Sequence, residues 1–237
     1  MKPALLLLPG LLCDQDVWRG QIAALSDRYD CRVVDYGALD SLPAMAELAL
    51  AGTAAAGGSF ALAGHSMGGR VAFELLRRAP QRVSRLILMD TGFLPRGQGE
   101  HGAAETAQRQ HLVALAYSHG MRAMGREWLR GMVPERRWQD DELIEAILAM
   151  VERKTPEIHE AQIRALLTRP DASDVLPGIA CPTLLLCGRK DQWSPLARHE
   201  QMAQLIPGAR LGVIEQAGHM TTMECPDQVS AALRAFL

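Results

Sequence analysis

A serine in a glycine-flanked turn is the first feature of this chain that suggests chemistry. Residues 64–68 read Gly-His-Ser-Met-Gly and fit the pattern Gly-x-Ser-x-Gly. The apolar segment 60–63 precedes the turn and an amphipathic helical pattern follows it, a context that holds a serine hydroxyl clear of a sheet. A side chain at Gly64 or Gly68 would collide with neighbouring backbone, and glycine has no Cβ. The pattern therefore predicts that Ser66 is a nucleophile.

A serine hydroxyl is a weak nucleophile, so a general base is expected elsewhere in the chain. His219 is the best candidate, because it follows the apolar strand candidate 211–214 by a short loop and precedes a helix. His65 lies in the nucleophile turn and is expected to point away from the hydroxyl. We expect surface or structural roles for it and for the remaining histidines: His101, His111, His119, His159 and His199.

The base needs an acid that fixes its tautomer and stabilises its cation. Asp191 follows the strand candidate 183–187 and precedes a helix. Its position between Ser66 and His219 gives the chain order serine, acid, histidine, which is one of the known orders for such a triad. Asp90 also ends a strand candidate and is the competing acid. The chain order and the loop context favour Asp191.

A serine nucleophile that attacks a carbonyl also needs N–H donors for the oxyanion that forms. The backbone N–H of Met67 directly follows the nucleophile at a helix N-terminus, where the helix dipole favours an anion. A second donor is expected from residues 9–12, the loop after the first strand candidate. We predict Leu11 N–H for this role, with Leu12 N–H as the alternative.

The elements that must position these residues alternate between strand and helix, as in a parallel sheet covered on both faces. The predicted strands are 4–8, 31–36, 60–63, 83–89, 183–187 and 211–214. The predicted helices between and after them include one capped by Asp14 or Asp16, and 43–56, 67–78, 195–205 and 227–236. The fold class is therefore α/β, with about six mostly parallel strands and helices on both faces.

Between residues 92 and 176 the alternation stops and no strand candidate appears. Helical stretches are expected at 103–118, 121–131, 140–153 and 156–168. We predict an α/β core made of residues 1–91 and 177–237, interrupted by a helical cap, residues 92–176.

Composition excludes several classes of protein. The formal net charge of −2 does not suit nucleic acid or an anionic membrane, and no apolar stretch reaches the length of a membrane span. The apolar run 5–8 is broken by Pro-Gly and lacks a cleavage site, so we interpret it as a buried strand. Five scattered cysteines suit reduced thiols and a cytoplasmic location. A metal site would need clustered Cys and His residues, and the sequence has no such cluster.

With these motifs in place, the chain resembles the α/β-hydrolase superfamily over nearly its whole length. The matching stretches are Leu8–Leu11, Gly64–Gly69, Gly188–Pro195 and Ala217–His219. Within the superfamily it resembles small bacterial serine carboxylesterases, including the pimeloyl-carrier-protein methyl ester esterases. The resemblance implies a helical cap, no cofactor, and hydrolysis of a small-molecule ester or thioester through an acyl-enzyme. It also leaves open the cofactor-free perhydrolase/haloperoxidase and carbon–carbon bond hydrolase branches, and a non-catalytic ligand-binding protein on the same fold.

Two departures from this superfamily affect the expectations. Relatives usually carry His-Gly in the oxyanion loop, whereas this chain has Pro9-Gly10. Relatives also usually begin with an antiparallel hairpin that is missing here, so segment 31–36 should be a sheet edge. An unpaired edge invites pairing, which leaves a monomer or a homodimer as expectations.

Arginines in the predicted cap raise the question of a partner. Arg122, Arg126 and Arg130 recur every four residues and share one helix face. With Arg136 and Arg137 they are suited to an acidic acyl-carrier protein or a substrate carboxylate. The alternative is a solvated face balanced by nearby acids, which we favour because charge runs are usually solvated. Those acids are Asp140, Asp141, Glu142 and Glu145.

Overall fold

The computed structural model describes residues 2–53 and 58–237, and its centre is a six-stranded parallel sheet. The strand order is β2-β1-β3-β4-β5-β6, and every neighbouring pair is parallel. This confirms the predicted fold class. The strands are β1 (Ala4–Leu8), β2 (Asp30–Val33), β3 (Phe60–His65), β4 (Val83–Met89), β5 (Thr183–Gly188) and β6 (Arg210–Ile214).

The sequence of the central strands explains why they lie inside. Every residue of β1, β3 and β5 is buried, and their sequences are near-continuous apolar runs without polar alternation. Such runs are typical of strands covered on both faces. The edge strands β2 and β6 are mostly half-buried and carry Asp30, Arg32 and Arg210. Charged residues on edge strands discourage pairing with another chain.

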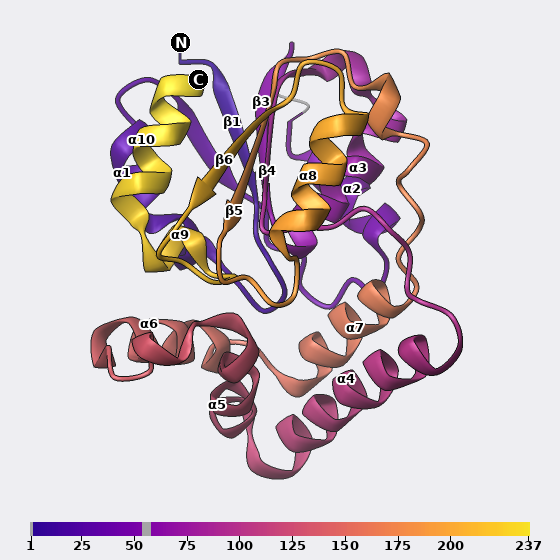
Figure 1. Cartoon of the computed structure of the whole chain (residues 1–237), viewed down its shortest axis with the longest axis vertical. Coiled ribbons are helices and arrows are strands. Elements are labelled where there is room, and N and C mark those ends of the chain that lie inside the picture. The colour runs from indigo at the N-terminus through magenta and orange to yellow at the C-terminus, as the bar shows by residue number, and fades with distance from the viewer. Residues whose placement is uncertain (1, 54–57) are drawn as a thin grey trace.

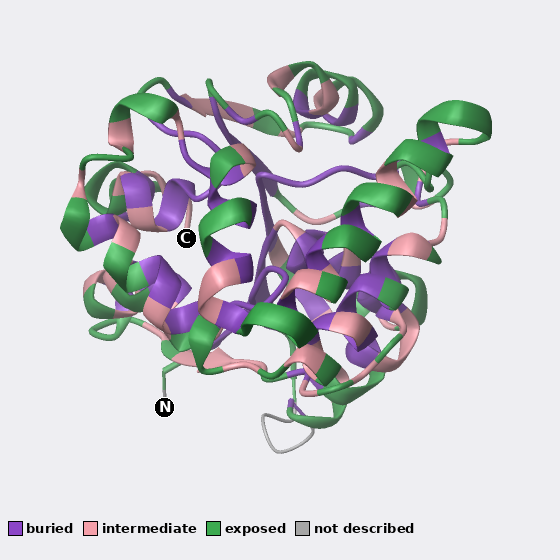
Figure 2. Cartoon of the chain, turned by 90° about the horizontal axis from the view of Figure 1, so that it is seen from below, coloured by how far each residue is buried: buried purple, intermediate pink, exposed green. Residues whose placement is uncertain are grey.

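Helices cover both faces of the sheet (Figure 1). Helices α1 (Arg19–Leu25), α9 (Thr221–Glu224) and α10 (Pro226–Phe236) lie on one face. Helices α2 (Leu42–Ala51), α3 (Met67–Arg78) and α8 (Leu196–Leu205) lie on the other. Most of these helices turn a buried stripe inward and an exposed stripe outward (Figure 2), as expected for helices that pack on a sheet.

Two predicted elements are shorter than expected. The strand expected over 31–36 ends at Val33, because its partner β1 ends at Leu8 and the last backbone bond runs from Val34 N–H to Leu7 O. The helix expected over 43–56 ends at Ala51, with Gly52 at its C-cap. Residues 54–57, which include the predicted end of that helix, lie outside the described residues. The helix expected after Asp14 starts with a 3₁₀ turn over Gln15–Trp18, whose N-cap is Asp14.

Four further helices occupy the stretch between β4 and β5. They are α4 (Gly99–His119), α5 (Met121–Met132), α6 (Asp141–Glu152) and α7 (Pro156–Leu167). Side chains of Asp140 and Thr155 cap α6 and α7, and Gly120, with φ of +83°, makes the turn between α4 and α5. This helical segment lies beyond the carboxyl ends of the strands, on the side opposite the two chain termini (Figure 1).

Two further observations concern the whole chain. All five cysteines are free thiols. No described helix is both long and apolar enough to cross a membrane.

Candidate active site

The turn between β3 and α3 holds Ser66 in a strained backbone conformation, with φ of +53°. Close packing explains the neighbouring glycines. A Cβ on Gly64 would lie 2.5 Å from Gly68 O, and one on Gly68 would lie 2.0 Å from Leu8 O. A Cβ on Gly69 would lie 2.6 Å from the side chain of Thr91, so this glycine lets α3 approach the loop after β4. The strain and the packing together fix where the Ser66 hydroxyl points.

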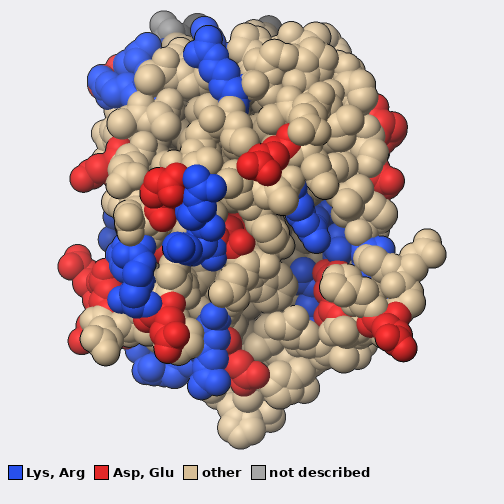
Figure 3. All heavy atoms as spheres, viewed as in Figure 1, with Lys and Arg blue, Asp and Glu red and all other residues tan. Residues whose placement is uncertain are grey.

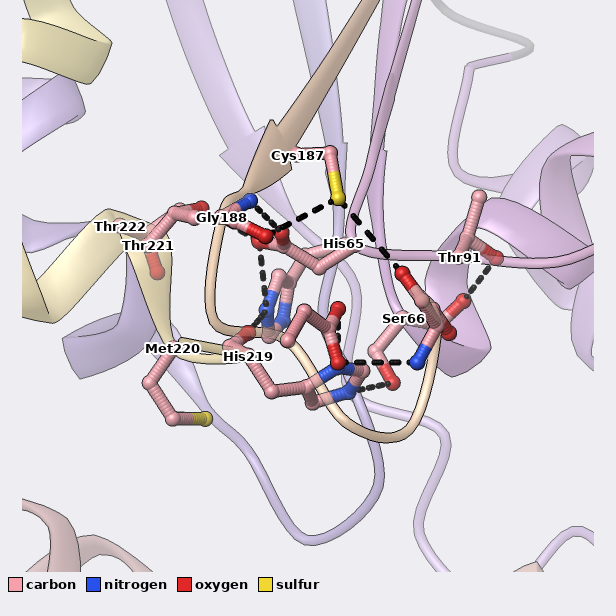
Figure 4. A network of polar contacts seen from close by, with 12 residues as sticks. His65, Ser66, Thr91, Cys187, Gly188, His219, Met220, Thr221 and Thr222 are labelled. Atoms are coloured by element: carbon pink, nitrogen blue, oxygen red, sulfur yellow. Dashed lines mark hydrogen bonds and ion pairs between the residues drawn. The ribbon is translucent and has the colours of Figure 1, made fainter. Parts of the chain in front are cut away.

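The structure brings Ser66, His219 and Asp191 into one hydrogen-bonded chain. Ser66 Oγ lies 2.7 Å from His219 Nε2, and His219 Nδ1 lies 2.8 Å from Asp191 Oδ2. Figure 4 shows the imidazole of His219 directed at the Ser66 hydroxyl. Each residue follows the end of a strand: Ser66 follows β3, Asp191 follows β5 and His219 follows β6. This geometry fits a nucleophile, a base and an orienting acid.

The two candidate acids have different partners. The carboxylate of Asp191 accepts N–H bonds from Trp193 and Ser194, both at 2.8 Å, in addition to the His219 contact. Burial raises its pKa, but the charge and hydrogen bond of His219 and these N–H groups outweigh burial, so the pKa of Asp191 is lowered. Asp90 instead accepts bonds from Gly188 N–H, at 3.0 Å, and from the Thr221 hydroxyl. Its geometry therefore does not compete for His219 Nδ1.

The loop that carries His219 is held from two sides. The backbone N–H of His219 donates to Met132 O at the end of α5, at 2.8 Å. The buried carboxylate of Glu224 accepts from Gly218 N–H and Met220 N–H, and burial raises its pKa to about 7. Burial disfavours the charged imidazole, but the charge and hydrogen bond of Asp191 outweigh it and raise the pKa of His219 above 6.5. The ring is thereby prepared to accept a proton.

The other buried histidines near the site have structural contacts. His65 Nε2 lies 2.8 Å from His219 O, so its ring points away from the Ser66 hydroxyl, as predicted. His199 Nε2 accepts the Thr91 N–H at 3.1 Å. Burial lowers the pKa of both rings to about 4, so they are neutral near pH 7. His65 and His199 therefore support the loops around the triad without titrating in the physiological range.

The candidate oxyanion donors differ in how they are occupied. The N–H of Leu12, a residue with φ of +61°, donates to Gln162 Oε1 of α7 at 2.9 Å. Within the described part of the chain, neither Leu11 N–H nor Met67 N–H has a hydrogen-bond acceptor. Both residues line the same cavity as Ser66. Leu11 is thus free to donate where Leu12 is not.

A cavity of about 450 Å³ opens at these residues. The loops at the strand ends contribute Ser66, Met67, Leu11 and His219. The helical segment contributes side chains from α4, α5 and α7 and from the loop after α7, among them Glu105, Trp128, Leu166 and Arg169. The volume of the cavity is in the range of small-molecule sites.

One group of side chains near the triad has the composition of a metal site. Ligand atoms of Asp90, Cys187 and Asp191 lie within 4.8 Å of one another. Both carboxylates already accept hydrogen bonds, and burial together with the nearby Asp90 and Asp191 charges strongly raises the pKa of the Cys187 thiol. A metal would need the thiolate, so these groups fit a hydrogen-bond network better than a metal centre.

Several residues around the site were not anticipated from the sequence. Trp193 packs between helices, with its indole 5.2 Å below the Arg109 guanidinium and 2.3 Å from where a Cβ on Gly131 would stand. Gln162 and Glu224 hold the loops of Leu12 and His219 from distant elements. Nothing in the spacing of these residues marks them, because the fold alone brings them to the site.

The arginines singled out in the helical segment lie away from this cavity. Arg122 pairs with Glu145 and Glu152, and Arg137 pairs with Asp140. Arg126, Arg130 and Arg136 are exposed. Figure 3 shows basic and acidic side chains interspersed over this part of the molecule. The pairing is the kind expected of a solvated, balanced face.

Comparison with known proteins agrees with the fold. The model of the Alpha/beta hydrolase family matches residues 5–232, so the chain belongs to this family. It is 28% identical to the pimeloyl-[acyl-carrier protein] methyl ester esterase of Nitrosomonas europaea, over 99% of this chain and 95% of that protein. The corresponding enzyme of Aeromonas hydrophila is 26% identical with the same coverage. The chain is therefore a hydrolase of the esterase type.

Solved structures give the same result. A thermophilic esterase from Thermogutta terrifontis, solved with malate bound, superposes with a TM-score of 0.86 at 30% identity, over 99% of this chain and 89% of the esterase. The enol-lactonase from Burkholderia xenovorans LB400 superposes with a TM-score of 0.87 at 21% identity, over 100% of this chain and 91% of the lactonase. The lactonase supports the fold alone.

Proposed function

We propose that this hydrolase cleaves a carboxylic ester or thioester of a small to medium acyl group through an acyl-enzyme on Ser66. The observation that carries the proposal is the hydrogen-bonded succession from Ser66 Oγ through the His219 ring to Asp191 Oδ2, at 2.7 and 2.8 Å. These distances are those at which a base can take a serine proton. The relatives with similar sequences that are named esterases agree with this reaction.

The proposed reaction has two halves. His219 Nε2 takes the Ser66 proton while the oxygen attacks the carbonyl, and His219 then gives that proton to the leaving alcohol or thiol. Water, deprotonated by His219, releases the acid and restores Ser66. Asp191 holds the Nδ1–H tautomer and stabilises the imidazolium. The N–H groups of Met67 and Leu11 would hold the oxyanion, and the engagement of Leu12 by Gln162 supports Leu11 as the second donor.

The helical segment, residues 92–176, is proposed to act as a cap that selects the substrate. It supplies much of the cavity wall and also holds the His219 backbone through Met132. The acidic acyl-carrier partner suggested by the related esterases is less favoured, because Arg122 and Arg137 are already paired with acids. A free small-molecule ester is the substrate class that we propose.

The test combines labelling with turnover. A fluorophosphonate should label the wild-type protein but not Ser66→Ala. Hydrolysis of p-nitrophenyl acetate and butyrate should fall by about 10⁴-fold or more in Ser66→Ala, because members of a triad act as a unit. The matched control is Ser118→Ala, which removes a surface serine of α4 and should behave as wild type.

Three results would redirect the proposal. Equal labelling of wild type and Ser66→Ala would remove Ser66 as nucleophile. No turnover by a folded wild type, together with ligand binding, would indicate a non-catalytic protein on this fold. Halide-dependent peroxide chemistry, or cleavage of a carbon–carbon bond next to a ketone, at rates above ester hydrolysis would place the chain in one of those other branches.

A further inference from the structure

The cavity that contains Ser66 has a strongly basic lining. The arginines come from α3, α4, the loop after α7, and α8, and they are Arg70, Arg109, Arg169 and Arg198. Among the described residues that line the cavity, Glu105 is the one acid. Figure 3 shows basic side chains gathered in a recess between the sheet layer and the helical segment, on the right of the view.

Glu105 neutralises only part of this charge. Arg169 donates to both of its oxygens, at 2.7 and 2.8 Å, and Arg109 Nε donates to Oε1 at 3.0 Å. Burial opposes the charged carboxylate, but these arginines outweigh burial and lower the pKa of Glu105 to about 2. Glu105 is therefore ionised and fully engaged by Arg109 and Arg169. It does not pair with Arg70 or Arg198.

Arg70 and Arg198 converge without a carboxylate between them. A Cβ placed on Gly92 would lie 3.1 Å from Arg70 Nη2 and 3.2 Å from Arg198 Nη1, so a terminal nitrogen of each group lies beside Gly92 and the two groups are close together. Arg70 Nη1 donates to Leu94 O at 2.9 Å. Within residues 2–53 and 58–237 neither arginine forms an ion pair, and the residues outside that range are Met and an Ala-Ala-Ala-Gly stretch without carboxylates.

Two converging guanidinium groups without a counterion are costly in a partly desolvated site. Each guanidinium offers five N–H donors in a fork that matches a carboxylate. Burial, followed by the charges of Arg169, Arg198 and Arg109, lowers the pKa of Arg70 to about 9. An anion bound between Arg70 and Arg198 would relieve the repulsion and use the free donors.

We propose that Arg70 and Arg198 bind a carboxylate of the substrate, so that the preferred ester is a monoester of a short dicarboxylic acid. This inference rests on the proposed ester hydrolysis at Ser66. The free carboxylate lies between the two guanidinium groups while the ester carbonyl lies at Ser66 Oγ.

The geometry limits the length of the substrate. Arg70 follows Ser66 by four residues on α3, which places its Cα about 6 Å further along the helix axis. The cavity of about 450 Å³ is shared by both groups. Within this volume we expect a spacer of a few carbons between the two carbonyl carbons, as in succinate, glutarate or adipate monoesters.

The first experiment compares matched esters by proton release at constant pH. Monomethyl glutarate and methyl pentanoate have acyl chains of equal length and differ chiefly in the terminal carboxylate. We expect wild-type kcat/KM to be at least tenfold higher for monomethyl glutarate, mainly through a lower KM. Monomethyl succinate and monomethyl adipate then report the preferred spacer length.

The second experiment removes each arginine separately. In Arg70→Gln and Arg198→Gln, the preference for the charged ester over the neutral one should fall at least tenfold, with KM rising more than kcat falls. Arg70→Lys should retain part of the preference, because it keeps the charge but loses the fork. The matched control is Arg126→Gln, an exposed arginine of α5, which should leave both substrates unaffected.

Binding without turnover separates this proposal from the proposed reaction. Titration calorimetry of glutarate into Ser66→Ala should give binding that weakens at least tenfold in Ser66→Ala/Arg198→Gln. If wild type hydrolyses neutral esters but shows no preference for the charged one, the carboxylate site is wrong while the hydrolase stands. If glutarate binds through the arginines but no ester is cleaved, the hydrolase assignment is wrong while the anion site stands. Equal loss on both esters in both arginine variants would indicate a structural role and overturn the proposal.

Discussion

The two walls of the cavity are built in different ways. On the sheet side, Ser66, Asp191 and His219 are fixed by backbone hydrogen bonds and by glycines that touch neighbouring backbone. On the side of the helical segment, Arg109 and Arg169 are held by a charge pair with Glu105. Rigid backbone contacts suit groups that must be aligned closely for reaction, whereas charge and shape suit recognition. The comparison predicts that changes to the triad affect every substrate. Changes to the arginines around the cavity, which come from α3 and α8 as well as from the helical segment, should affect selection.

The largest effect is expected when the acid of the sheet side is altered. Asp191→Asn keeps an oxygen for the Trp193 and Ser194 N–H groups but no longer favours the productive tautomer of His219. We expect kcat to fall by about 10⁴-fold on charged and neutral esters alike. The measurement is steady-state kinetics on both esters, with melting curves to verify folding.

Asp90→Asn is the matched control for this variant. Asp90 lies in the same buried network but is bonded to Gly188 and Thr221 instead of His219. Its loss should cost much less activity than the loss of the Asp191 charge. A larger effect of Asp90→Asn in a folded protein would exchange the roles of the two acids.

The pH dependence of kcat/KM should distinguish the role of the triad from that of the arginines, and the expected effect is smaller. Below the pKa of His219 the ring is protonated and cannot take the Ser66 proton, so kcat/KM should fall about tenfold per pH unit. Because Asp191 raises this pKa, the fall should begin above pH 6.5 on either ester. The ratio of kcat/KM for the two esters should stay nearly constant between about pH 5.5 and 8, since this range lies below the pKa of about 9 of Arg70.

Two variants identify the group that titrates. In Asp191→Asn the midpoint should move to lower pH, because burial remains while the raising charge is removed. Glu224 titrates in the same range, with a pKa of about 7, and Glu224→Gln removes it. A midpoint that disappears in Glu224→Gln and is unchanged in Asp191→Asn would show that the profile reports the loop and not the base.

Much of the sheet side could be predicted from the sequence because its signals are local. Apolar runs identify the buried strands, and Gly-x-Ser-x-Gly requires its turn by simple sterics. The strand at 31–36 was too long in the prediction because its end is set by the length of β1, a neighbour that the segment itself does not reveal. The sequence does not distinguish Leu11 from Leu12 as a donor, because the difference depends on Gln162, about 150 residues away.

The arginines show the limit of predicting a binding site from the periodicity of charges. Arg122, Arg126 and Arg130 are conspicuous because they repeat every four residues, yet such a repeat places them on the outer face of α5. Arg70 and Arg198 are isolated in the sequence and lie on different helices, and only the packing of α3 and α8 around Gly92 brings them together. The relevant signal was spatial convergence, which spacing along the chain does not contain.

The smallest effect is therefore expected from the outer arginines. Reversing the charge of Arg122, Arg126 and Arg130 together should change kcat/KM within about twofold on either methyl ester, because exposed side chains contribute little. Arg122→Glu would face Glu145 and Glu152, so the double variant Arg126→Glu/Arg130→Glu serves as a second version without that repulsion. The same variants are measured on an ester carried by an acyl-carrier protein. A loss of tenfold or more confined to that substrate would show that the outer face of α5 docks a carrier, and substrate choice would then depend on this face as well as on the arginines of the cavity.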